Sequence, residues 1–107
     1  MNTATNDLVF RPFYLVERLT GELGVSVSYA YEDLVFLEHS DVLLQFDQVE
    51  QDTLRFYINS YLESSAVEIV RDRWLQAALM HQVKLVFCGS FSVEQTFGKE
   101  EINITFN

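Results

Sequence analysis

Apolar residues recur at two different spacings along this chain, and the changes between those spacings mark out its elements. A spacing of three and four residues is typical of a helix with one buried face, whereas alternation is typical of a half-buried strand. The helical spacing occurs near the start of the chain and again from residue 65. Alternation fills most of the sequence between these segments and after them. The pattern therefore predicts helices that pack on a sheet.

The first helical segment begins after Arg11-Pro12. Proline fits the first turn of a helix because its missing N–H would have no partner there. Gly21 and Gly24 mark the end, since glycine readily adopts the left-handed conformation that terminates helices. We expect a short helix whose buried stripe contains Phe13, Val16, Leu19, Thr20 and Leu23.

Four strands in a meander are predicted between the two helical segments. Alternation covers Val25–Tyr31, Val42–Asp47 and Leu54–Asn59, with short polar turns between the strands. The unbroken apolar run Leu34–Leu37 is typical of a strand that is buried on both faces. Short connections of this kind join antiparallel neighbours.

The second helical segment carries a capping box, Ser65-Ala66-Val67-Glu68, which predicts that the helix starts there and runs to about His81. Ile69, Leu75, Leu79 and Met80 lie off its core face, so we expect this helix to pack on two sides. The predicted core stripe consists of Val67, Val70, Trp74, Ala77 and Ala78.

Alternation resumes from Val83 to Val93, where Gly89 interrupts it and predicts a bulge or bend. Ile102, Ile104 and Phe106 form a last strand. The predicted fold is thus α+β, with an antiparallel sheet of about six strands, two helices packed on one face, and the order α-β-β-β-β-α-β-β. Residues 1–107 suit a single domain, with residues 1–7 as a loose tail.

Charge and composition narrow the range of partners. The formal charge of −9 repels phosphate backbones and anionic lipids, so we expect no nucleic-acid or membrane binding and favour a basic protein or peptide. Hydrophobic residues make up 49% of only 107 residues, so we expect a partner, most simply a second copy in a homodimer, to cover some of them. The chain shows no signal peptide and no long apolar run, which favours a cytoplasmic location.

No recognisable catalytic, cofactor or metal motif is present, so we expect no catalytic activity and no bound cofactor. His39, His81 and Cys88 are too far apart in sequence for a typical zinc site. Glu38-His39-Ser40-Asp41 contains the residue types of a catalytic triad, but triads are usually assembled from distant segments. We interpret this segment as a polar turn and Cys88 as a packed thiol.

The acidic residues are unevenly distributed: seven lie between Glu32 and Asp52, with no Lys or Arg among them. Turns favour Asp and Glu, which accounts for the bias without a functional role. The functional alternative is an acidic rim around apolar strands. If Phe36, Leu44, Phe46 and Phe56 face the core, the opposite side chains form an apolar centre. The candidate partner-binding surface then comprises Val35, Leu37, Leu43 and Tyr57 with Glu38, Asp41, Glu50 and Asp52.

Three functional hypotheses fit these features. The first is a small acidic protein-binding or assembly module, homodimeric and without catalytic activity. The second is an inhibitor or immunity-type protein that neutralises a basic partner, in a complex that salt would weaken. The third is a small-molecule-binding domain or enzyme with an aromatic-lined pocket, to which Tyr29, Tyr31, Tyr57 or Trp74 contributes.

Overall fold

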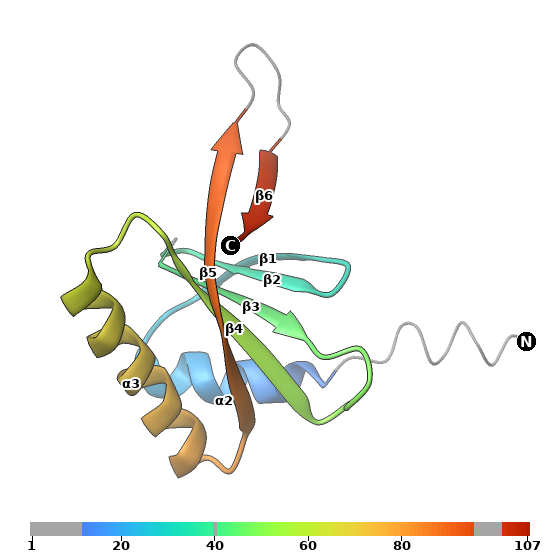
Figure 1. Ribbon diagram of the computed structural model, residues 1–107. Coiled ribbons are helices and arrows are strands. Elements are labelled where there is room, and N and C mark those ends of the chain that lie inside the picture. The colour runs from blue at the N-terminus through green and yellow to red at the C-terminus, as the bar shows by residue number, and fades with distance from the viewer. Residues whose placement is uncertain (1–11, 40, 96–101) are drawn as a thin grey trace, which may run out of the picture.

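The computed structural model describes residues 12–39, 41–95 and 102–107, and within them the chain forms the predicted α+β architecture (Figure 1). The predicted tail, residues 1–7, and Ser40 of the polar turn lie outside the described residues. The elements follow the predicted order. Their bounds are α2 (Phe13–Leu23), β1 (Val27–Tyr31), β2 (Leu34–Leu37), β3 (Val42–Phe46), β4 (Thr53–Asn59), α3 (Ser64–Met80), β5 (Lys84–Gln95) and β6 (Ile102–Phe106).

Across the described residues the strands form one sheet in the order β1-β2-β3-β4-β5-β6. The predicted meander is confirmed: β1 to β4 are antiparallel neighbours, as are β5 and β6. The sheet departs from a purely antiparallel arrangement at β4 and β5, which run parallel. A parallel pair needs a long crossover connection, and α3 provides it.

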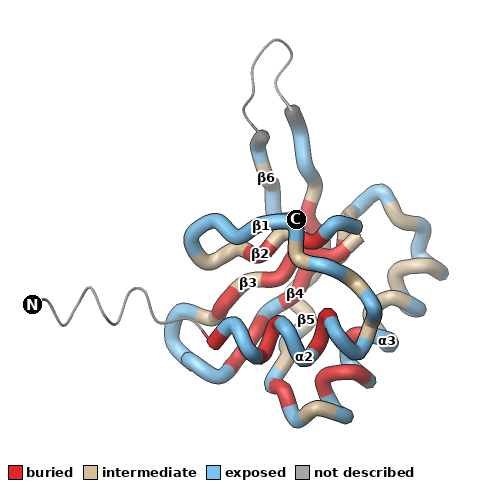
Figure 2. The backbone as a smooth tube through the Cα atoms, turned by 180° about the vertical axis from the view of Figure 1, so that it is seen from behind, coloured by how far each residue is buried: buried red, intermediate tan, exposed pale blue. Residues whose placement is uncertain are grey.

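Both helices of the described chain pack on one face of the sheet, as predicted, and the main hydrophobic core lies between the two layers (Figure 2). Leu19 of α2 and Trp74 of α3 are buried in this core. The Trp74 ring stacks on Phe56 of β4, with ring centroids 6.2 Å apart. At the helix ends, His81 Nε2 lies 2.9 Å from Glu22 Oε1. Burial of a large apolar side chain such as Leu19 or Trp74 stabilises the fold by about 1.5–3 kcal/mol.

The N-cap of helix α3 lies two residues earlier than predicted, and the predicted capping box of Ser65 and Glu68 is wrong. Glu63 is the N-cap residue, and its carbonyl accepts a hydrogen bond of 2.9 Å from Val67 N. Leu62, directly before it, packs against the core and fixes where the chain enters the helix. Ser65 therefore lies inside the first turn, and no side-chain hydrogen bond caps this helix within the described structure.

The predicted core stripe of α3 is confirmed. Trp74, Ala77 and Ala78 are buried, and Val67 and Val70 pack against the core while partly exposed. The expected packing of the helix on a second side is not found within the described chain. The outward-facing apolar residues are exposed there: Ile69, Leu75, Leu79 and Met80.

The predicted irregularity at Gly89 is a β-bulge. Phe56 pairs with Phe87 and Ile58 with Ser90, so three steps along β5 oppose two steps along β4. Gly89 has a φ of 121°, a conformation that side chains with a Cβ atom rarely adopt. The bulge shifts the register of β5 at the point where its pairing with β6 begins.

We predict that Gly89→Ala destabilises the protein by about 1–3 kcal/mol, because an L-residue at this φ is strained. The matched control is Gly21→Ala, at an exposed position inside α2 where an added Cβ meets nothing within 4 Å. This control should stabilise the protein by about 0.5–1 kcal/mol, because alanine favours helices. Chemical denaturation measures both changes. Equal effects of the two substitutions would contradict the assignment of the bulge to Gly89.

Candidate protein-binding face

The face of the sheet opposite the helices carries a second apolar cluster, which we call the open face. The described helices contribute no residue to it. Leu43, Tyr57 and Phe91 are buried at its centre. The strand register and ring contacts place further apolar side chains around them. The open face comprises Tyr29, Tyr31, Leu34, Phe36, Leu43, Tyr57, Cys88, Phe91, Val93, Ile104 and Phe106.

The predicted centre of the surface, Val35, Leu37, Leu43 and Tyr57, is only half right. Leu43 and Tyr57 belong to the open face, but Val35 and Leu37 are buried in the core beneath the helices. The cause is the register of β2, in which Phe36 pairs with Leu43 and therefore shares its face. Since β2 is entirely apolar, its sequence does not reveal which residues point toward the helices.

Aromatic rings cover much of the open face and remain partly accessible. Tyr29 stacks on Phe36 with ring centroids 5.0 Å apart, and Phe106 lies 4.4 Å from the Tyr57 ring. Tyr29 is nevertheless 53% exposed, Val93 44% and Phe106 43%. An uncovered apolar surface on a small soluble protein is a feature of interaction sites.

A groove hollows the open face beside the β2–β3 turn. Its volume is about 450 Å³. Phe36, Leu43, Phe91 and Val93 line its apolar part, and Tyr61 stands at its end. The Tyr61 hydroxyl donates a hydrogen bond to Asp41, so an acidic group borders the groove. The groove can receive apolar side chains of a partner while a basic group of the partner meets Asp41.

Polar side chains on the open face form a chain of hydrogen bonds that orients Tyr57 at its centre. The Tyr57 hydroxyl donates to Gln45 Oε1 at 2.9 Å, and Gln45 Nε2 donates to Asp33 Oδ2 at 3.0 Å. Burial is the main cause that raises the pKa of Tyr57, and the neighbouring Cys88 thiol adds to it. The half-buried thiol lies 3.6 Å from the Val86 carbonyl oxygen, consistent with the expected packed thiol.

The acidic residues lie at both ends of the sheet. Glu38 and Asp41 flank the β2–β3 turn. At the other end, Asp33 joins the β1–β2 turn to the β3–β4 turn through a hydrogen bond from Gln48 Nε2 at 3.3 Å. Glu50, in the β3–β4 turn, is exposed. Carboxylates that form no ion pair with a described base therefore lie near each end of the apolar centre.

The bases on this side of the described sheet are paired with acids. Arg55 Nε lies 3.5 Å from Asp47 Oδ1, and Lys84 Nζ lies 3.2 Å from Asp52 Oδ2. The pKa of Asp47 is lowered chiefly by its hydrogen bond from the Glu50 N–H, and the pKa of Asp52 chiefly by Lys84. Asp52, a predicted rim residue, is therefore an exposed ion-pair partner of Lys84.

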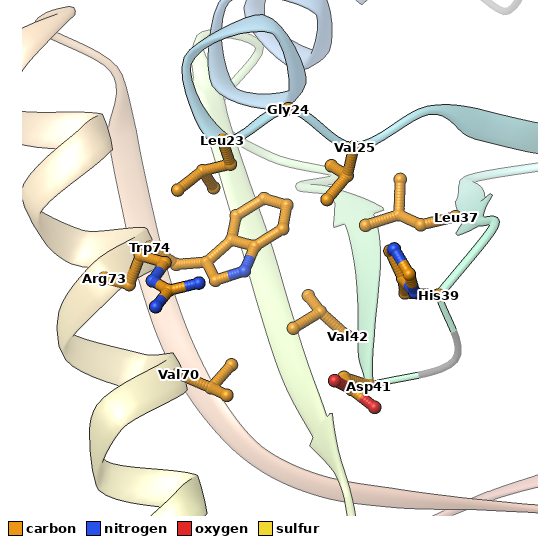
Figure 3. Close-up of a pocket in the computed structure, with 10 residues that line it drawn as sticks. All are labelled: Leu23, Gly24, Val25, Leu37, His39, Asp41, Val42, Val70, Arg73 and Trp74. Carbon is orange, nitrogen blue, oxygen red and sulfur yellow. The ribbon is translucent and has the colours of Figure 1, made fainter.

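A second, smaller hollow lies on the helix side, next to Trp74 (Figure 3). The other three aromatic residues predicted to line a pocket do not join it. Tyr29, Tyr31 and Tyr57 are on the open face, and Tyr31 pairs there with Leu34. Of the four aromatic residues named as alternatives, Trp74 is therefore the one that faces this hollow.

Phe91, Ile104 and Phe106 are open-face residues that the sequence analysis did not include in its surface. Their alternation in the last two strands signalled that they share a face. Placing that face beside Tyr57 requires the crossover that sets β5 parallel to β4. Hydrophobic periodicity contains no information about that pairing.

The sequence matches no known protein family, and comparisons with curated proteins and with solved structures give no significant match. Neither α2 nor α3, the helices of the described chain, is long and apolar enough to cross a membrane. Function must therefore be inferred from the side chains that the fold brings together.

We predict that Tyr57 ionises above pH 10.0, the ordinary pKa of tyrosine, because burial favours its neutral form. Its contribution to stability is then fully present below about pH 10 and is lost as the pH rises through the raised pKa. Absorbance titration of the wild type and Tyr57→Phe, followed by subtraction, isolates this phenol. A difference curve with its midpoint at or below pH 10 would contradict the buried placement.

Proposed function

We propose that this chain is a protein-binding module that holds a basic, partly apolar segment of another protein on the open face of its sheet. The observation that carries the proposal is the apolar cluster around Leu43, Tyr57 and Phe91, which the described helices leave uncovered. The half-exposed rings of Tyr29 and Phe106 supply contact area at its margin. Aromatic side chains are enriched at the centres of protein interfaces.

The charge of the chain favours a basic partner over a second copy. The formal charge is −9, and the carboxylates of Glu38 and Asp41 lie near one end of the open face, where Asp41 accepts a hydrogen bond from Tyr61. Face-to-face association of two copies would bring like-charged rims together, whereas lysines and arginines of a partner would meet them favourably. The inhibitor or immunity-type protein of the sequence analysis is one form of this function. The predicted homodimer becomes the competing outcome of the experiment.

The test uses three synthetic amphipathic peptides in place of the unidentified partner. The first combines Leu, Phe and Lys, the second replaces Lys with Glu, and the third replaces the apolar residues with Ser. We expect calorimetry to show binding of the first peptide only, weakened by added salt because the charges at the rim are exposed. Equal binding of the Lys–Ser peptide would show that the apolar face is not used.

The matched variants separate the open face from other exposed apolar residues. Tyr29→Thr/Val93→Thr removes open-face contacts while keeping residues that favour strands, and should weaken the first peptide by about tenfold or more. Leu79→Gln/Met80→Gln removes exposed apolar side chains from α3 and should leave binding unchanged. Equal effects of the two double variants would contradict the proposal.

Light scattering of the chain alone decides between a partner and a second copy. We expect a monomer at physiological salt. A dimer that Tyr29→Thr/Val93→Thr dissociates, while the α3 double variant does not, would overturn the basic partner and assign the open face to self-association.

A further inference from the structure

The hollow on the helix side has features of a small-molecule site that is separate from the open face. It has a volume of about 270 Å³, just below the usual range of about 300–1,000 Å³ for ligand pockets. It lies between α3, the end of α2 and the β2–β3 turn. Trp74, Val70, Leu37 and Val42 contribute apolar surface, so an apolar ligand body would lose contact with water there.

Hydrogen-bond donors from Trp74, Arg73 and His39 line this hollow. Trp74 is only 5% exposed, and Figure 3 shows its indole ring projecting from α3 with the nitrogen toward the hollow. Arg73 of α3 and His39 of the β2–β3 turn also line the hollow. Among the described residues, none of these three side chains forms a hydrogen bond. No buried side-chain nitrogen or oxygen of the described residues lacks a hydrogen-bond partner, so the indole N–H is a solvent-accessible donor that a ligand in the hollow can reach.

We propose that this hollow binds a small organic carboxylate with an apolar body. A carboxylate accepts several hydrogen bonds at once, and arginine matches its planar geometry better than any other side chain. The carboxylate oxygens would accept from Arg73 and from the indole N–H of Trp74. The apolar body would lie on Val70, Val42 and Leu37, and His39 would close the far side.

The acidic surroundings do not oppose this assignment. Asp41 is the acidic residue among those that line the hollow, and its carboxylate already accepts a hydrogen bond from Tyr61. Other exposed acids are screened over about 8 Å at physiological ionic strength. Arg73 lies within the hollow and forms no ion pair with any described residue, so its charge is available to a ligand.

The experiment follows the indole N–H of Trp74, the single tryptophan of the chain, by NMR spectroscopy of isotope-labelled protein. Phenylacetate, phenylacetamide and phenethylamine serve as probes with one shared ring and different head groups. We expect phenylacetate to shift the indole resonance in a saturable way and the other two probes to leave it in place. Saturable shifts of similar affinity with the amide or the amine, or no saturable shift with phenylacetate, would overturn the proposal.

Arg73→Gln and Arg18→Gln form the matched pair of variants. Both arginines are exposed, but Arg18 belongs to α2, where its guanidinium lies over the Tyr14 ring. Arg73→Gln should weaken phenylacetate binding by about tenfold or more, because charge-assisted pairs are the strongest hydrogen bonds. Arg18→Gln should leave it unchanged. Equal affinities of the two variants would show that the carboxylate is not bound at this hollow. The peptide experiments on the opposite face are unaffected by either result.

Discussion

The packing of α2 and α3 against a single face of the sheet is the constraint on which the rest of the molecule depends. The Trp74–Phe56 stack and Leu19 lie in that layer, and burial of such side chains is the dominant favourable term in folding. Because both described helices cover the same face, the opposite face is left to solvent or to another molecule. The aromatic residues on that second face therefore serve the sheet itself and whatever it binds.

The fold class and the order of elements could be predicted because polar residues mark the period of most segments. The core stripe of α3 and the bulge at Gly89 followed from the same signals. The facing of β2, that is, which of its side chains point toward the helices, could not be predicted, since Leu34–Leu37 contains no polar residue. That facing depends on the turn at Glu32, which has a φ of 55°, and on the pairing of Phe36 with Leu43. For this reason Val35 and Leu37, two of the four residues predicted for the apolar centre, lie in the core instead.

The two proposed binding regions lie on opposite sides of one structural feature, the turn between β2 and β3. Leu37, His39 and Val42 line the hollow beside Trp74 and also the groove of the open face. The ends of β2 and β3 thus separate the two regions, and polar side chains border each region. Sequence alone suggested acidic turns at this end of the sheet, but the convergence of Arg73 and Trp74 on the same wall required the tertiary fold.

The parallel ladder between β4 and β5 also has a consequence for how the chain assembles. The β1–β4 meander and the β5–β6 hairpin each form from neighbouring segments, which costs little loop-closure entropy. Joining the two requires α3 to be ordered first or at the same time, because α3 spans the connection. The slow step of folding is thus expected to be the docking of a preformed hairpin onto a preformed meander, with α3 acting as the tether.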